Sequence, residues 1–257
     1  MHRWQDVFKD SKIDMESFTR IRLLIGDDAF EKLQTKKVAV FGLGGVGGAA
    51  CDALSRSGIS KLILFDFDRV QQSNMNRLTI ADGRDIGRMK TEVMMSRILS
   101  FNPNAEIKTF NKFIDKDAYD AVIAEEKPDF CVDAVDSLRP KIETIMRLVS
   151  AKARFISSMG AGGRFDPSKV RIGSLDEVGG CGLASRIRRV LRNSGIYTEK
   201  IKTVYSEEHP VKPLPPEKDA VSERGRTRGT QSSCMMVPVT FGMNIASFVI
   251  RELLRKP

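Results

Sequence analysis

The stretch "VAVFGLGGVGGAACDAL", from Val38 to Leu54, decides the fold class of this chain. A short run of apolar residues leads into a cluster of glycines, and helix-forming residues follow. This order predicts a buried strand, a tight turn and a helix whose amino end faces phosphate groups. Gly42, Gly44 and Gly47 have the spacing G-x-G-x-x-G, and Asp66 follows Gly42 at about the separation, roughly 20 residues, typical of a ribose-binding acid. Taken alone the motif suggests NAD, but it is weak by itself, and the residues after Asp66 favour a different nucleotide.

Strands and helices alternate around this stretch as far as about residue 165. We expect further strands at 61–68, 105–113, 129–136 and 154–159, and helical sequence at 16–35, 89–103, 118–126 and 140–152. This alternation predicts an α/β fold with a doubly wound, mostly parallel, Rossmann-like sheet. Because ligands of such sheets bind at the carboxyl ends of the strands, Gly42, Asp66, Asp136 and Gly160 should gather around one site.

The pattern weakens after about residue 166. A short basic amphipathic helix is expected at 183–195, and the Pro-rich, charged stretch at about 206–230 predicts a mobile surface loop. The apolar run at 234–250 is shorter than the roughly 20 residues that span a bilayer, so it predicts a buried strand or loop followed by a core helix, with no membrane contact. We therefore expect one domain over 1–257, with a nucleotide-binding core at 30–165 and a C-terminal extension at 166–257 for the substrate or a dimer contact.

The composition is that of a globular protein with an excess of positive charge. Apolar residues make up 41% and charged residues 29% of the 257 residues, and the formal net charge is +9. Such a charge suits a polyanionic partner, but by itself it leaves nucleic acid and an ordinary solvated surface equally open. The first residues contain no apolar stretch typical of a signal peptide, so we expect a cytoplasmic protein.

The cysteines offer little catalytic chemistry. Cys51, Cys131, Cys181 and Cys234 are far apart and form no C-x-x-C pair, which argues against a zinc site or a disulfide framework. Cys51 and Cys131 fall in predicted core elements, and Cys234, with the two methionines after it, is also expected in the core. Cys181 is left open between an incidental thiol and one that receives an activated group. The two histidines lie in a tail and a loop, where neither has the surroundings of a general base.

Charged and polar side chains cluster around the predicted nucleotide site. The set consists of Asp66, Asp68, Asn74, Arg77, Lys90 and Asp136. Cations stabilise the charge that builds on a transferring phosphoryl or nucleotidyl group, and a carboxylate can hold Mg²⁺. A hydride-transfer enzyme has little use for these groups. The sequence thus favours ATP with Mg²⁺ over NAD.

This set resembles the ATP site of the ubiquitin-activating-type superfamily, the MoeB, ThiF and HesA group. The superfamily pattern runs G-x-G-G-x-G, D-x-D, S-N-x-x-R, a lysine and D-x-x-D. This chain has "GLGGVG", "DFD", "SNMNR", Lys90 and "DAVDS" in that order. The resemblance implies an ATP-binding turn formed by Gly42, Gly44, Gly45 and Gly47.

The same resemblance implies a role for each polar residue. Asp66 would bind the ribose, with Asp68 and Asn74 beside the nucleotide. Arg77 and Lys90 would bind the phosphates as catalytic residues. Asp136 would serve catalysis as the ligand of Mg²⁺.

The family resemblance also implies contacts with other protein chains. In some members an N-terminal arginine reaches the ATP of a neighbouring subunit, and "FTRIRLLIG" offers Arg20 for that catalytic role. The family implies a homodimer, with the apolar C-terminal segment as an expected part of its interface. Some relatives also have a sulfur-relay partner protein.

A narrower resemblance is to the tRNA threonylcarbamoyladenosine dehydratases. MoeB- and ThiF-like proteins usually carry paired C-x-x-C zinc motifs, which this chain lacks. The likeness to the dehydratases lies in "DSLRPK", "GAGGRFDPSKVRI", "RIRRVLRNSGI" and "VYSEEHP". The chain departs from them before the arginine helix, where relatives usually read D-P-L-A and this chain reads "GCGLAS".

The narrower resemblance implies an ATP-dependent tRNA-modifying enzyme. Such an enzyme adenylates the carboxylate of threonylcarbamoyladenosine in tRNA and cyclises it with loss of water. The basic helix, together with Arg224, Arg226 and Arg228 in the loop, would then form a tRNA-contacting surface. Phosphate contacts of this kind weaken steeply as salt rises.

Two other classes of function stay open from the sequence. One is an adenylyltransferase that activates the C-terminal glycine of a ubiquitin-like or sulfur-carrier protein. The other is a non-catalytic nucleotide-binding or redox module. Pyrophosphate exchange that depends on a carrier protein would favour the first, and tight NAD binding without ATP binding would favour the second.

Overall fold

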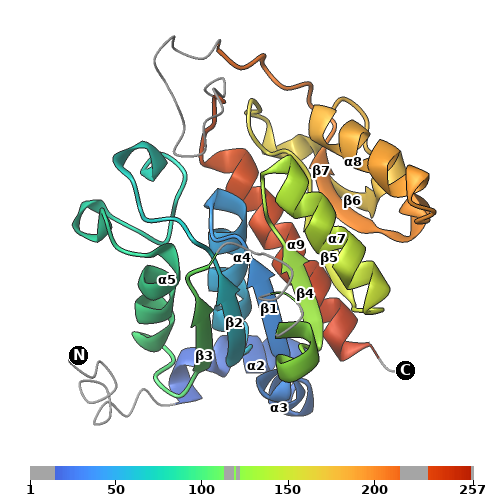
Figure 1. Cartoon of the computed structure of the whole chain (residues 1–257). Helices are drawn as coiled ribbons and strands as arrows, with labels where there is room; N and C mark the ends of the chain where they lie inside the picture. Colours follow the sequence, from blue (N-terminus) through green and yellow to red (C-terminus); the bar gives the residue numbers. More distant parts are fainter. Residues whose placement is uncertain (1–14, 113–118, 120–121, 215–230, 256–257) are drawn as a thin grey trace.

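The computed structural model describes residues 15–112, 119, 122–214 and 231–255, whose arrangement is drawn in Figure 1. The strands are β1 (Lys37–Phe41), β2 (Lys61–Phe65), β3 (Glu106–Phe110), β4 (Phe130–Asp133), β5 (Phe155–Ser158), β6 (Val170–Ser174) and β7 (Lys202–Ser206). The α-helices are α2 (Thr19–Ile25), α3 (Asp27–Thr35), α4 (Gly45–Arg56), α5 (Lys90–Leu99), α7 (Leu138–Ser150), α8 (Gly182–Asn193) and α9 (Met236–Leu254). Short helical turns are η1 (Met15–Phe18), η2 (Gln72–Asn74), η3 (Gly83–Asp85), η4 (Val122–Glu126), η5 (Pro167–Lys169), η6 (Leu175–Glu177) and η7 (Thr198–Lys200).

The strands form one sheet in the order β3-β2-β1-β4-β5-β7-β6. Every neighbouring pair is parallel except β6 and β7, which are antiparallel. The chain continues to β2 and β3 on one side of β1 and to β4 on the other, and ligands of doubly wound sheets bind at such a switch point. The predicted fold class is therefore confirmed: an α/β fold with a doubly wound, mostly parallel sheet and a C-terminal extension.

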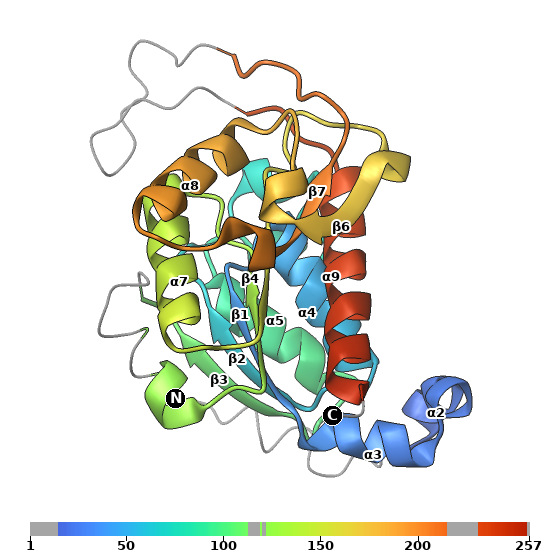
Figure 2. The same cartoon turned by 90° about the vertical axis from the view of Figure 1, so that its right-hand side faces the viewer.

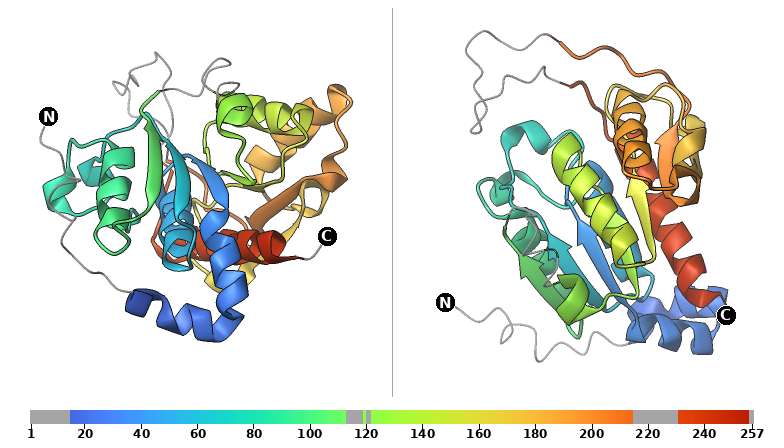
Figure 3. Two further views of the ribbon diagram at one scale, coloured as in Figure 1. Left: turned by 90° about the horizontal axis from the view of Figure 1, so that it is seen from below. Right: turned by 45° about the vertical axis from the view of Figure 1, so that its right-hand side comes forward.

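Helices cover both faces of the sheet (Figures 2 and 3). On one face α4, α5 and α9 pack against the strands through apolar residues such as Leu54, Met94 and Phe241. On the other face Leu148 of α7 packs against Phe41 and other strand residues. This explains why β2 reads as the almost unbroken apolar run "KLILF", since a strand covered on both faces has no solvent side.

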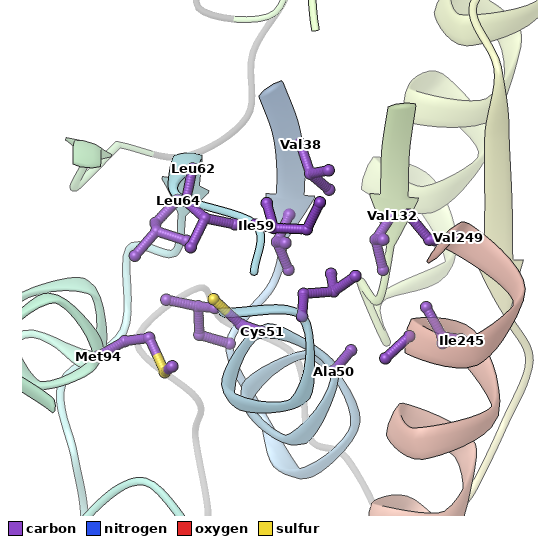
Figure 4. Packing of buried hydrophobic residues seen from close by; sticks show 14 of the residues in the cluster. Val38, Ala50, Cys51, Ile59, Leu62, Leu64, Met94, Val132, Ile245 and Val249 are labelled. Carbon is purple, nitrogen blue, oxygen red and sulfur yellow. The ribbon is translucent and has the colours of Figure 1, made fainter. Parts of the chain in front are cut away.

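The C-terminal helix α9 crosses α4 closely, on the face drawn in Figure 4. Ala50 of α4 lies near Ile245 and Val249 of α9 in this view. A Cβ on Gly242 would lie 2.7 Å from the backbone nitrogen of Ala50, so a glycine at the crossing allows the two helices to approach. The contact brings the end of the chain back onto the helix that begins at the glycine turn.

Helix α9 differs from the expected strand or loop followed by a helix. The run at 234–250 is almost entirely helical, because α9 begins at Met236. Pro238 is tolerated there because it stands in the first turn, where its missing N–H would have had no intrahelical partner. By length and composition α9 is the one helix in the described ranges that is apolar enough to cross a membrane. Its packing on α4 is that of a core helix.

The ends of other strands and helices also differ from the predicted ones. The expected strand at 129–136 ends at Asp133, so Asp136 lies in the loop after β4 instead of ending the strand. The expected helix at 89–103 ends at Leu99. A chain leaves a strand or helix where its backbone partners end, and the residue pattern alone does not mark that point.

The extension adds two strands that the sequence pattern did not reveal. β7 pairs with β5 in parallel and with β6 in antiparallel, so residues 166–257 continue the sheet of the predicted core. "VRIGS" and "KTVYS" mix polar and apolar residues, and β6 lies at the edge of the sheet. Of the predicted loop at 206–230, residues 215–230, with Arg224, Arg226 and Arg228, lie outside the described residues.

Candidate functional site

The glycine turn joins β1 to α4, and its glycines serve different purposes. Gly42 has φ +88°, which residues with a side chain rarely adopt, and a Cβ there would lie 2.9 Å from the carbonyl oxygen of Ala134. A Cβ on Gly47 would lie 1.8 Å from the Gly42 oxygen, so this glycine lets α4 pack on the turn. At Gly44, the N-cap of α4, a Cβ would meet nothing within 4 Å. Gly44 thus faces open space at the positive end of a helix, where a phosphate can approach.

Asp66 links this turn to the end of β2. Its Oδ2 accepts the N–H of Leu43 at 2.6 Å and its Oδ1 accepts the N–H of Asp68 at 2.8 Å. Burial raises the pKa of Asp66 above its ordinary value, while the Lys90 ammonium and these two backbone donors act in the opposite direction. The carboxylate stands after β2, where the acid that binds the ribose lies in dinucleotide sites.

Lys90 begins α5 and forms a charged cluster with the two acids after β2. Its Nζ lies 2.8 Å from Asp68 Oδ2 and 3.9 Å from Asp66 Oδ2. The Lys90 side chain is 9% exposed, whereas that of Asp68 is 49% exposed. A mostly buried ammonium therefore has one partner that is open to solvent, and a phosphate oxygen can replace such a partner.

Arg77 follows η2 and lies over the first turn of α4. A Cβ on Gly45 would lie 3.2 Å from the Arg77 oxygen and 3.5 Å from its Cγ. Arg77 Nη1 donates to Asn76 Oδ1 and to a carbonyl oxygen of η2, both at 2.9 Å. The side chain of Asn74 serves its own turn, since Oδ1 accepts the N–H of Gln71 at 3.2 Å.

Asp136 lies in the loop between β4 and α7, with its side chain exposed. Ser137 Oγ donates to Asp136 Oδ1 at 3.2 Å. The loop touches the glycine turn, because a Cβ on Gly42 would lie 3.3 Å from the nitrogen of Val135. The site residues thus follow the carboxyl ends of three strands. The glycine turn follows β1, this loop follows β4, and the two acids, Arg77 and Lys90 follow β2.

Sequence reasoning missed a buried ion pair that holds this loop. The side chains of Lys141 and Asp133 are both 0% exposed, with Nζ 2.8 Å from Oδ2. Lys141 Nζ also donates to Val135 O at 2.9 Å, and Ser157 Oγ donates to Asp133 Oδ2 at 2.6 Å. The pair ties α7, β4 and β5 together directly before Asp136. A signal was present, because Lys141 shares the buried stripe of α7 with Thr144, Ile145 and Leu148.

Arg20 does not join this cluster within one chain. It is exposed on α2, which lies with α3 at the end of the sheet where β1 begins (Figures 1 and 2). The glycine turn follows the other end of β1. Leu23 and Leu24 on the same helix are 82% and 79% exposed, so α2 presents apolar and basic side chains outward.

The four cysteines divide into three buried thiols and one half-buried thiol. Burial raises the pKa of Cys51 and Cys131, the latter to about 12, so both remain thiols in the core as predicted. Cys181, the N-cap of α8, is buried in an apolar cluster, which matches an incidental thiol. The prediction of a core position for Cys234 was wrong. It is half-buried before α9, where its Sγ donates to Arg164 O at 3.2 Å, and the two following methionines are exposed.

The predicted basic helix is α8, and its arginines are not equivalent. Arg188 Nη1 donates to the carbonyl oxygens of Leu175 and Val178, and Arg192 pairs with Asp176 at 2.9 Å. These two arginines therefore hold the extension together. Arg186 and Arg189 are exposed and carry the outward positive charge of the helix.

The comparisons with known proteins identify the family of this chain. The model of the ThiF family matches residues 18–199. The chain is 30% identical to the tRNA threonylcarbamoyladenosine dehydratase of Bacillus subtilis (strain 168) over 245 residues, which covers 94% of this chain and 96% of that protein. It is 34% identical to ubiquitin-like modifier-activating enzyme 5 of Drosophila persimilis over 123 residues, which covers 44% of this chain and 32% of that protein.

A solved structure is similar over nearly the whole chain. The E. coli tRNA N6-threonylcarbamoyladenosine dehydratase TcdA in complex with AMP has a TM-score of 0.84 and 27% identity, covering 95% of this chain and 96% of that one. The same protein in complex with ATP has a TM-score of 0.81. The sheet and its switch-point site define an α/β protein of the nucleotide-binding class. The chain belongs to the ThiF family.

Proposed function

We propose that this protein is an ATP-dependent tRNA threonylcarbamoyladenosine dehydratase. One observation carries the proposal: the glycine turn and its charged cluster occur in a chain that matches dehydratases from end to end. The match covers 94% of the chain for the Bacillus subtilis enzyme, against 44% for ubiquitin-like modifier-activating enzyme 5. This difference favours a tRNA substrate over the C-terminal glycine of a ubiquitin-like protein.

The proposed reaction activates a carboxylate. The carboxylate oxygen of the threonylcarbamoyl group attacks the α-phosphorus of ATP, the bond to the β-phosphate breaks, and pyrophosphate leaves. The neighbouring carbamoyl group then attacks the activated carbon and loses a proton, and the bond from that carbon to the AMP oxygen breaks. The oxygen that the substrate loses departs on AMP, so the net change in the nucleoside is the loss of one water.

The chain's own residues act by binding, orientation and charge stabilisation. Backbone N–H groups at Gly44 and Gly45 face the phosphates at the amino end of α4. The carboxylate of Asp66 accepts from the ribose hydroxyls. Lys90 and Arg77 stabilise the negative charge that grows as pyrophosphate leaves.

Asp136 fits the role of a magnesium ligand. Mg²⁺ in nucleotide sites takes one or two carboxylates and completes its shell with phosphate oxygens and water. Asp136 presents an exposed carboxylate beside the glycine turn. Among the described residues no group of three acidic, histidine or cysteine side chains would hold a metal alone, so the ion would bind together with ATP. When bound, Mg²⁺ neutralises charge on the phosphates.

The exposed arginines of α8 support a tRNA-contacting surface. Arg186 and Arg189 point away from the apolar stripe that α8 buries, which includes Ile187. Each phosphate contact that is removed should lower the salt dependence of tRNA binding by about one counterion. Arg186→Ala and Arg189→Ala should therefore each flatten the plot of log affinity against log salt. A slope that stays unchanged in both variants would exclude α8 from the tRNA interface.

A homodimer would bring Arg20 to an ATP site. α2 projects from its own chain with Leu23 and Leu24 exposed, and a second copy would bury them. Co-expression of Arg20→Ala and Lys90→Ala chains tests this arrangement, because a mixed dimer contains one site with both residues intact. Activity recovered in the mixture supports Arg20 acting across the dimer, and a mixture as inactive as its parents contradicts it. The sulfur-relay partner and the cytoplasmic location stay predictions.

The test of the main proposal is a direct one. The protein is incubated with Mg-ATP and threonylcarbamoylated tRNA, and the digested nucleosides are weighed. We expect AMP release and a nucleoside lighter by one water. Unchanged tRNA, with pyrophosphate exchange that instead requires a ubiquitin-like protein, would establish the alternative.

A further inference from the structure

A small pocket opens beside the nucleotide site, and the proposed reaction leaves it unassigned. Its volume is about 180 Å³. It is lined by residues 163–165 after β5, by Glu208 and Val211 after β7, and by Ser232 and Ser233 before α9. Two of its three walls come from "GAGGRFDPSKVRI" and "VYSEEHP", segments in which the chain resembles the dehydratases.

Hydrogen bonds hold the three walls in place. Glu208 accepts the N–H groups of Phe165 and Asp166 at 3.0 and 2.8 Å, and both of its carboxylate oxygens take part. Gly163 N donates to Ser232 O at 2.7 Å, and Val211 N donates to Gly163 O at 2.7 Å. The pocket is therefore a fixed feature of the described loops.

Arg164 places a positive charge in the pocket wall. Its side chain is 5% exposed, with Nε donating to Glu208 O at 2.8 Å and Nη1 donating to carbonyl oxygens of residues 160 and 162. Its Nη2 is buried and has no hydrogen-bond partner among the described residues. Buried donors are nearly always paired, so an unpaired guanidinium nitrogen here is what an oxygen-rich, anionic ligand would explain.

Phe165 stands at the mouth of the pocket with its ring in solvent. The side chain is 69% exposed, although its backbone N–H is held by both oxygens of Glu208. The ring therefore adds little to the core while its position is fixed. Proteins that bind unpaired RNA bases stack them on exposed aromatic side chains placed in this way.

The pocket and the nucleotide site share one segment of chain. Ser233 O accepts from Asn76 Nδ2 at 2.9 Å, and Asn76 directly precedes Arg77. Further along, Pro238 of α9 meets the glycine turn, since a Cβ on Gly45 would lie 3.2 Å from the Pro238 Cβ. A ligand held at the pocket thus lies next to the residues proposed to hold the phosphates of ATP.

We infer that this pocket is the acceptor subsite, with the Phe165 ring stacking on the adenine base and the cavity beside Arg164 taking the anionic threonylcarbamoyl chain. The inference rests on the proposed function. A volume of about 180 Å³ is below the roughly 300–1,000 Å³ of pockets that enclose a whole ligand of drug size, so the cavity has room for a small acyl chain but not for a whole nucleotide. The base therefore stays at the mouth, against the ring, while the carboxylate lies in the cavity, whose wall at Ser233 contacts Asn76 next to Arg77.

A double-mutant cycle tests the stacking contact. The full chain and its Phe165→Ala variant are titrated with two anticodon stem-loop RNAs, one with adenosine at the modified position and one with an abasic nucleotide there. The intact protein should bind the adenosine RNA about 5- to 150-fold more tightly, the range expected for one stacked base. In Phe165→Ala that preference should vanish, while ATP affinity and the thermal midpoint stay unchanged. Phe165→Trp should keep the preference.

Tyr197 provides a matched control. It is also 69% exposed, but it lies after α8 and is not among the residues that line the pocket, so Tyr197→Ala should leave the preference for the adenosine RNA intact. Equal preference in the intact protein and Phe165→Ala, or a loss in Phe165→Trp as large as in Phe165→Ala, would overturn the inference. A protein that removes water from the modified tRNA but shows no such coupling contradicts the subsite alone. A protein that does not process the modified tRNA contradicts the proposed function itself.

Discussion

Two lysine–aspartate pairs lie at the carboxyl ends of β2 and β4, the strands on either side of β1, and they have opposite roles. Lys90 pairs with Asp68, whose side chain is 49% exposed, and lies 3.9 Å from Asp66. Lys141 pairs with Asp133 at the same 2.8 Å distance, but both side chains are fully buried. The first ammonium can exchange its exposed partner for a phosphate, whereas the second has no access to any ligand. The comparison separates a lysine that acts on a substrate from one that holds a loop.

The largest effect is expected from breaking the buried pair. Lys141→Ala leaves the Asp133 carboxylate buried without its counter-charge, which should cost about 3–5 kcal/mol of unfolding free energy. Chemical denaturation measures the loss. Lys36→Ala is the matched control, because Lys36 pairs with Asp129 at the other end of β4 and both side chains are partly exposed. That variant should lose no more than about 1 kcal/mol. Similar losses in the two variants would mean that the buried pair has no special role.

Lys90→Ala should change the activity strongly and the stability little, which is the opposite of what we expect for Lys141→Ala. Removing a group that stabilises developing charge costs about 10²–10³-fold in turnover. AMP release with threonylcarbamoylated tRNA measures it. Lys61→Ala is the control, since Lys61 starts β2 and pairs with Glu106, far from the glycine turn. A Lys90→Ala enzyme with nearly normal turnover would remove Lys90 from the mechanism.

Two glycines of the turn also differ in having a structural or a ligand-binding role, and the expected effects are smaller. An alanine at position 47 would place its Cβ 1.8 Å from Gly42 O, so Gly47→Ala should destabilise the fold by about 1–3 kcal/mol. A Cβ on Gly44 would have no atom within 4 Å, so Gly44→Ala should keep the fold. Its methyl group would occupy the space proposed for a phosphate, so the affinity for ATP should fall by on the order of tenfold. Melting curves and ATP titrations of both variants separate the two effects. Unimpaired ATP binding in Gly44→Ala would place the phosphates elsewhere.

The smallest effect concerns the protonation of Asp66. Burial raises the pKa of Asp66 above its ordinary value of 3.8. The folded chain therefore holds this proton to a higher pH than the unfolded chain, and the stability contributed by Asp66 falls as pH rises between the two pKa values. ATP binding changes in the other direction, because a protonated Asp66 accepts less well from the ribose.

The ATP affinity should thus fall on acidification through that raised pKa. Comparison of the intact protein with Asp66→Asn at each pH cancels the titration of ATP itself. The ratio of the two affinities should shrink towards low pH. A constant ratio across the range would show that Asp66 does not titrate in the nucleotide site.

The nucleotide end of the molecule was predictable from sequence because its signals are local. An apolar run that ends in glycines predicts strand, turn and helix wherever it occurs, and β1 and α4 appear where the pattern placed them. β2 begins at Lys61 as expected but ends at Phe65, before the acids that the expected strand at 61–68 included. The acids after β2 and the lysine that begins α5 follow from the same pattern, since parallel strands end at one edge. The comparison with known dehydratases then agrees with the family that these residues indicated.

The pocket and the buried pair were not predictable in the same way. Phe165, Glu208 and Ser232 are far apart in the chain, and no local pattern says that their loops meet. Cys234 illustrates the limit: apolar neighbours suggested the core, yet the chain is still at the surface there because α9 starts only at Met236. The spacing of Lys141 with Ile145 and Leu148 places it on the apolar stripe of α7, but only the tertiary structure shows that Asp133 is buried against it.

The sequence by itself determined the parallel sheet, the glycine turn and the acids and lysine around it, because hydrophobic periodicity and turn chemistry act over a few residues. Only the tertiary structure decided that β7 inserts between β5 and β6, that α9 returns to α4 at Gly242, and that Lys141 is buried against Asp133. These features depend on pairing and burial between segments far apart in the chain. Their energies come from partners that a local stretch of sequence does not contain.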